Sequence, residues 1–180
     1  MTIASAMEYA GDGGAQRLSR QEFEAFYEQT ARPLRSYLCR IAGNAAAADD
    51  LVQEAYVRLL VAPPMSAEHR KSYLYRTATN LVADQWRAQA RARKWWQLGW
   101  RRSEAAAREM ELASDVGRLF QRIGPRERAL LWLAYVEGAD HREIAAILQL
   151  KEKSVKVLLF RARRKMEGVL RDHGFGSSHE

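Results

Sequence analysis

Apolar residues recur every three to four positions through most of the chain, which is the spacing of one face of an α-helix. The first such stretch follows a capping box at Ser19–Glu22 and ends at Gly43. Pro33 lies inside this stretch, and we expect it to kink or divide the helix. The chain shows neither strict alternation nor clusters of β-branched residues. The pattern therefore predicts an all-α protein.

Further helices are bounded by proline and glycine signals. Pro63–Pro64 and Gly124–Pro125 interrupt the apolar pattern, and Gly138 is followed by an Asp140 cap. The helices predicted after the first one span about 46–61, 67–86, 103–123, 126–136, 141–148 and 152–171.

The last two of these helices have the spacing of a helix-turn-helix. Ile144, Ala145 and Leu148 form one apolar face, and the small Ala145 allows the next helix to approach closely. Leu150, in the short turn, is placed to fill the corner between the helices. The final helix is rich in lysine and arginine, as expected for a helix that enters a major groove. The alternative is a helical hairpin with a solvated basic face.

Positive charge is concentrated in the second half of the chain. The formal net charge is +7 and the isoelectric point is about 9.8. Residues 19–84 carry eight basic and eight acidic side chains, whereas residues 117–172 carry thirteen and seven. This asymmetry favours a polyanionic partner for the second half. Residues 87–103 are basic, lack acids and contain Trp95, Trp96 and Trp100. They predict either a linker beside nucleic acid or a segment packed between two domains.

Several classes of function are disfavoured. The longest apolar run, Ala129–Val136, is far shorter than a membrane span, and residues 1–14 do not resemble a secretory signal. Cys39 is the single cysteine, and the four histidines lack metal-ligand spacing. No phosphate-binding loop or nucleophile motif occurs. We therefore expect a cytoplasmic protein with no membrane partner, no enzymatic activity, no catalytic residues, no metal and no cofactor.

Two sets of motifs resemble bacterial extracytoplasmic-function (ECF) sigma factors. The segments 123–129, 135–138, 143–145, 154–156 and 161–163 resemble region 4 of that family, and 49–56, 72–76 and 80–84 resemble region 2. The resemblance implies two small helical domains joined by the basic, Trp-rich linker. The expected boundaries are a mobile tail at 1–18, region 2 at 19–92, the linker at 93–111, region 4 at 112–172 and a C-terminal tail at 173–180.

The resemblance also implies a role for residues of region 2. Asp50, Gln53 and Glu54 match the surface that docks on the β′ coiled coil of core RNA polymerase, whereas we assign Asp49 to helix stabilisation. A second set matches positions that bind the melted strand of the −10 element. Its members are Lys71, Tyr73, Arg76, Asn80 and Arg87. Aromatic, cationic and amide side chains are the groups that hold single-stranded bases.

Region 4 of the family reads the −35 element as duplex DNA and contacts the polymerase β flap. The positions that match its DNA-binding set are Lys153, Ser154, Lys156, Val157, Phe160, Arg161 and Arg164. This chain departs from the pattern at Val157, Leu158 and Gln149, where the family commonly has a small polar residue, a basic residue and glycine. Three interpretations stay open: an unusual −35 sequence, weak DNA binding, or a face that also meets a protein.

The function implied is that of an alternative sigma factor, which binds core polymerase, directs it to specific promoters and helps melt the −10 element. The implied partners are core polymerase and promoter DNA, and an anti-sigma factor is a third that the resemblance allows. Two other functions are alternatives: a sigma-like decoy that sequesters an anti-sigma factor, and a helix-turn-helix regulator that binds duplex DNA alone.

Overall fold

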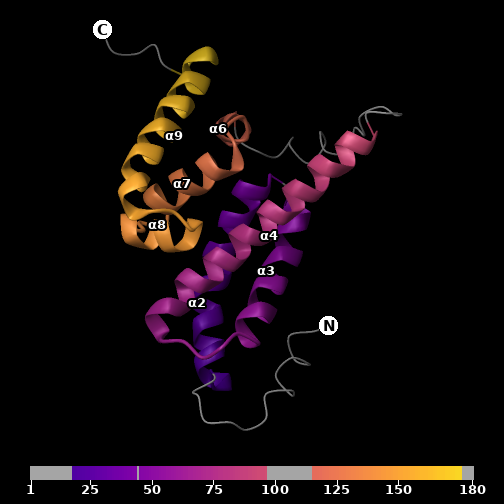
Figure 1. Cartoon of the computed structure of the whole chain (residues 1–180), viewed down its shortest axis with the longest axis vertical. Helices are drawn as coiled ribbons and strands as arrows, with labels where there is room; N and C mark the ends of the chain where they lie inside the picture. Colours follow the sequence, from indigo (N-terminus) through magenta and orange to yellow (C-terminus); the bar gives the residue numbers. More distant parts are fainter. Residues whose placement is uncertain (1–17, 44, 97–114, 176–180) are drawn as a thin grey trace.

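The computed structural model describes residues 18–43, 45–96 and 115–175. Within these ranges all regular structure is helical, and the prediction of an all-α protein is confirmed. The helices are α2 (Arg20–Ala42), α3 (Ala45–Leu60), α4 (Ala67–Trp96), α6 (Asp115–Phe120), α7 (Pro125–Tyr135), α8 (His141–Leu148) and α9 (Glu152–Asp172). Helices α2 to α4 form one group, and α6 to α9 pack beside it (Figure 1).

Helix α2 begins as its sequence predicts and continues where it was expected to break. The Ser19 hydroxyl accepts a hydrogen bond from the Glu22 amide at 3.2 Å, and the Glu22 carboxylate accepts one from the Ser19 amide at 2.9 Å. The expected division at Pro33 is wrong, because one helix runs through to Ala42. Leu34 and Tyr37, just beyond the proline, are fully buried. Their packing offsets the backbone hydrogen bond that a proline removes.

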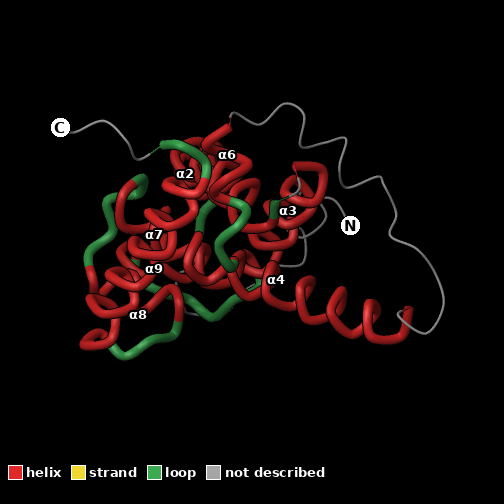
Figure 2. Tube along the Cα trace, turned by 90° about the horizontal axis from the view of Figure 1, so that it is seen from above, coloured by secondary structure: helices red, strands yellow, loops and turns green. Residues whose placement is uncertain are grey.

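Helices α2, α3 and α4 share an apolar core. The buried side chains from these helices are Phe23, Leu34, Tyr37, Leu38, Ile41, Ala48, Leu51, Val52, Ala55, Tyr56, Leu59, Leu74, Tyr75, Ala78, Leu81 and Val82. Cys39 is half-buried beside this core, in keeping with a packing role. Helix α4 extends to Trp96, inside the predicted linker, and its C-terminal part projects beyond the other helices (Figures 1 and 2).

The predicted helix-turn-helix is present in α8 and α9. Asp140 caps α8 by accepting a hydrogen bond from the Glu143 amide at 2.8 Å. Gln149 ends α8 in the left-handed conformation, with φ of 53°. Leu150 then packs against the core, as expected for a residue in the corner. An exposed Leu158 would be expected on the outer side of α9, but this side chain is half-buried against the core.

The two groups of helices meet along an interface that we call the regional interface, formed where α7 contacts α2 and α8 contacts α4. The Gln121 side-chain amide donates a hydrogen bond to the carbonyl of Arg40 at 2.9 Å. Lys71 Nζ lies 3.6 Å from Glu137 Oε2, and the Glu137 side chain is only 10% exposed. In addition to these polar contacts, apolar residues of both groups belong to one continuous buried cluster.

Arg128 is an unusual member of the regional interface. Its side chain is 1% exposed and lies over the ring of Trp86, with 5.3 Å between the guanidinium carbon and the ring centroid. Its Nε and Nη2 atoms are buried without a hydrogen-bond partner. Burial lowers the pKa of this guanidinium to about 10. One of the positive charges counted in the basic second half of the chain, that of Arg128, is therefore buried in the regional interface.

Several predictions lie outside the described residues. They are the two tails over 1–17 and 176–180, the first part of the helix expected at 103–123, and the environment of residues 97–111. Among the described residues, no helix is both long and apolar enough to cross a membrane. The same part of the chain holds no cluster of three or more potential metal ligands.

Candidate polymerase and promoter interfaces

An acidic and amide-bearing face lies on the outer side of α3. Asp50, Gln53 and Glu54 are all exposed, and their spacing of three and four residues places them side by side. The Glu54 carboxylate accepts a hydrogen bond from Arg58 Nε at 2.8 Å. This face presents carboxylate and amide oxygens, which are acceptors for basic side chains of a partner.

Asp49 has a different role from its neighbours. Its carboxylate pairs with Arg35 of α2, with oxygen–nitrogen distances of 2.5 and 3.1 Å. The hydrogen bond from Arg35 lowers the pKa of Asp49. The prediction that Asp49 serves the fold agrees with this contact, although the partner is another helix rather than the α3 terminus.

Four of the five residues predicted to bind the −10 strand share one face of α4. They are separated by three, four and seven residues, which places them on one side of a helix, and each is half-buried or exposed. These residues are Tyr73, Arg76, Asn80 and Arg87. The Arg76 guanidinium lies 5.2 Å from the centroid of the Tyr73 ring, and Arg87 pairs with Asp84. The α4 face therefore combines an aromatic ring, an amide and two guanidinium groups.

Lys71 does not belong to the α4 face. It lies on the opposite side of the helix, where it pairs with Glu137 across the regional interface. Tyr75 lies on that same side and is fully buried, and burial raises the pKa of its hydroxyl well above the usual range. The structure instead adds Arg91, which is exposed and follows Asn80 and Arg87 on the same face. Helical spacing carried through the basic segment could have identified it.

The predicted −35 residues lie on α9, away from the regional interface. Lys153, Lys156, Val157, Phe160, Arg161 and Arg164 are exposed, and Ser154 is half-buried. They lie on the side of the helix opposite the buried residues Val155, Leu159 and Ala162. The structure brings the predicted set together along one side of α9.

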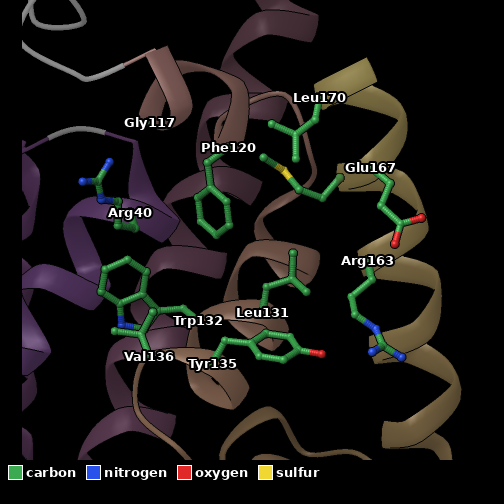
Figure 3. Close-up of a pocket in the computed structure, with 11 residues that line it drawn as sticks. Arg40, Gly117, Phe120, Leu131, Trp132, Tyr135, Val136, Arg163, Glu167 and Leu170 are labelled. Atoms are coloured by element: carbon green, nitrogen blue, oxygen red, sulfur yellow. The ribbon is translucent and has the colours of Figure 1, made fainter. Parts of the chain in front are cut away.

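An apolar groove lies between α6, α7 and α9 and was not found by sequence reasoning. It measures about 530 Å³, and Phe120, Leu131 and Leu170 converge on it (Figure 3). Arg40, Arg163 and Glu167 supply charged groups at its edge. Tyr135 and Val136, which also line it, are large exposed side chains. A concave apolar surface with charged edges suits an apolar segment of another protein.

Comparison with known families accounts for both groups of helices. Residues 26–92 match the model of sigma-70 region 2, and residues 114–166 match that of sigma-70 region 4. The chain belongs to the ECF sigma factors.

Similar proteins carry the same family name. The chain is 26% identical over 173 residues to SigL of Mycobacterium tuberculosis, an ECF RNA polymerase sigma factor, covering 89% of this chain and 96% of that protein. It is 27% identical over 151 residues to SigI of the same species, a probable ECF sigma factor, covering 75% of this chain. The chain spans about half of the SigI sequence, or 52%.

A solved structure has the same fold. The sigma factor RpoE of Bartonella quintana, crystallised with the anti-sigma factor NepR, superimposes with a TM-score of 0.66 at 18% identity. The match covers 84% of this chain and 98% of that one. The likeness extends across both groups of helices and confirms the fold.

Proposed function

We propose that the protein acts as an alternative sigma factor that binds core RNA polymerase, selects promoters and helps open the −10 element. The observation that carries the proposal is the presence of three chemically different surfaces in one family member. These are the acceptor-rich face of α3, the aromatic and amide face of α4, and the cationic side of α9. Polymerase docking, capture of melted bases and duplex reading require these respective chemistries.

The α3 face is the proposed contact for the β′ coiled coil. Exposed carboxylates at Asp50 and Glu54 attract a basic partner surface. Glu54→Lys should weaken binding to core polymerase about tenfold or more, because it replaces an attraction by a repulsion. Glu28→Lys on α2 is the matched control, since it changes the net charge equally at an exposed position elsewhere. Equal affinity of both variants would remove Glu54 from the docking surface.

The groove between α6, α7 and α9 is the proposed contact for the β flap. Its apolar lining supports insertion of apolar side chains, and Arg163 and Glu167 at the edge can pair with polar groups around them. Tyr135→Asp should weaken binding of the isolated flap domain without unfolding the protein, because Tyr135 is exposed. A flap affinity that this variant leaves unchanged would place the flap contact elsewhere.

Run-off transcription tests the function as a whole. Purified protein is added to sigma-free bacterial core polymerase and to a DNA fragment from upstream of its own gene. A discrete transcript that depends on the protein would support the proposal. Failure to bind core polymerase would contradict it and favour a decoy, whereas tight, sequence-specific duplex binding without polymerase would favour a stand-alone regulator.

A further inference from the structure

Two large apolar side chains lie in the middle of the recognition surface of α9. Val157 is 50% exposed and Phe160 is 54% exposed. Lys153, Lys156 and Arg161 surround them on the same side of the helix. These three cations form no ion pair within the described residues, so they are available to an anionic partner.

The apolar pair has no packing role within the part of the chain that the structure describes. Helix α9 packs on α6, α7 and α8, and it does so through Val155, Leu159 and Ala162 on its other side. Leu158 is half-buried against the core, so the departure from the family pattern at position 158 has a structural reason. Within the described residues, the structure shows no corresponding packing contact that would explain an apolar side chain at Val157 or Phe160.

The surroundings of the pair identify its partner. A ring of unpaired cations is complementary to a polyanion such as duplex DNA. Neither valine nor phenylalanine can hydrogen-bond to a base edge. The apolar feature that bases present in the major groove is the C5-methyl group of thymine.

We propose that Val157 and Phe160 select promoters by contacting thymine methyl groups in the −35 duplex. This inference rests on the proposed function and names the base that the same surface reads. The two residues are three positions apart on the helix, which corresponds to a rise of about 4.5 Å. Base pairs follow one another at about 3.4 Å. The two thymines should therefore lie at adjacent steps of the element, on the same strand or on opposite strands.

Replacing thymine by deoxyuridine tests the proposal directly, because it removes the methyl group and keeps the base pair. The assay measures promoter binding by the holoenzyme, on the promoter found by run-off transcription, with each −35 thymine replaced in turn. Two neighbouring replacements should each weaken binding about fourfold, the effect expected for one buried methyl group.

Variants then assign each methyl group to a side chain. In Val157→Ala the effect of one deoxyuridine replacement should become smaller, and in Phe160→Ala the effect of the other should become smaller. Lys153→Ala is the matched control: it should weaken binding to thymine and deoxyuridine templates equally, because a phosphate contact does not sense the methyl group.

The outcomes separate this proposal from the function on which it rests. Unchanged binding to every deoxyuridine template, or a −35 element without thymine on either strand, would overturn the methyl contact and leave sigma activity intact. A shift in oligomeric state on Val157→Ala or Phe160→Ala, with no deoxyuridine effect, would assign the patch to a second copy and overturn the proposal. Failure to bind core polymerase would instead contradict the sigma function.

Discussion

The α4 face and the α9 surface differ in how firmly their side chains are held. On α4, Tyr73 packs partly against the core and supports the Arg76 guanidinium, while Asn80 is half-buried. On α9, the apolar pair and most of the cations extend into solvent. A melted single strand is flexible, and ordering it costs free energy. Side chains that are already held in place by packing do not add to that cost when the strand binds. A duplex is already ordered, so flexible cations suffice to follow its backbone.

The largest expected effect comes from the α4 face. Asn80→Ala should lower promoter opening about tenfold, since it removes hydrogen bonds to a base edge. Permanganate reactivity of −10 thymines measures opening, and fluorescence anisotropy measures core binding, which should stay unchanged. Gln85→Ala is the control, because this amide lies on another side of the same helix. Parallel loss of opening and core binding would show that Asn80 supports the fold instead.

Salt dependence distinguishes the two surfaces next. Lys156→Ala should reduce the slope of log affinity against log salt by about 0.9, because one phosphate contact and its released counterion are lost. Asn80→Ala should leave that slope unchanged. Titration of holoenzyme binding to promoter duplex between low and moderate salt gives both values. Identical slopes for Lys156→Ala and the unaltered protein would mean that Lys156 contacts no phosphate.

Substitution of Lys71 should have a smaller effect than substitution of Asn80, and it should change stability rather than promoter opening. Since it lies on the side of α4 that faces Glu137, Lys71→Ala should leave promoter opening unchanged. It should lower the free energy of unfolding by no more than about 1 kcal/mol, the value of a partly exposed ion pair. Permanganate footprinting and thermal denaturation measure the two quantities. Loss of opening comparable to that of Asn80→Ala would place Lys71 back among the strand-binding residues.

The smallest effect concerns how α9 is positioned. Gln149 has a positive φ, which a residue with a β-carbon adopts at a cost. Gln149→Gly should raise the free energy of unfolding by up to about 1 kcal/mol, and Gln149→Ala should not. Thermal denaturation of both variants measures the difference. A stabilisation by alanine as large as that by glycine would assign the effect to the glutamine side chain.

Much of the fold was predictable because its signals are local. The capping box at Ser19–Glu22 and the cap at Asp140 each mark the start of a helix, and the spacing of apolar residues marks the buried faces. Pro33 does not divide the helix as a local signal allows, because tertiary packing of Leu34 and Tyr37 outweighs the local preference. The sequence could not show that Leu158 is half-buried, since that depends on how α9 packs against its neighbours.

The grouping of candidate site residues was predictable where helical spacing alone determines which side chains share a side of a helix. The α9 set and the α3 set each lie together as their spacing requires. Lys71 differs because it precedes Arg76 by five residues and Asn80 by nine, which are separations that turn a side chain away. Arg128 could not have been separated from the other arginines, because its burial arises only when α7 meets α2 and α4.

Gly43 connects the end of α2 to the position of region 4. Its φ of 75° is strained for any residue with a β-carbon, and such an atom would lie 2.6 Å from Gln121 Oε1. A substitution therefore strains the helix end and requires a shift of the Gln121 side chain, which donates a hydrogen bond to the Arg40 carbonyl. In a saturation library selected for activity, position 43 should be strongly enriched in glycine, although it lies outside all three proposed binding surfaces.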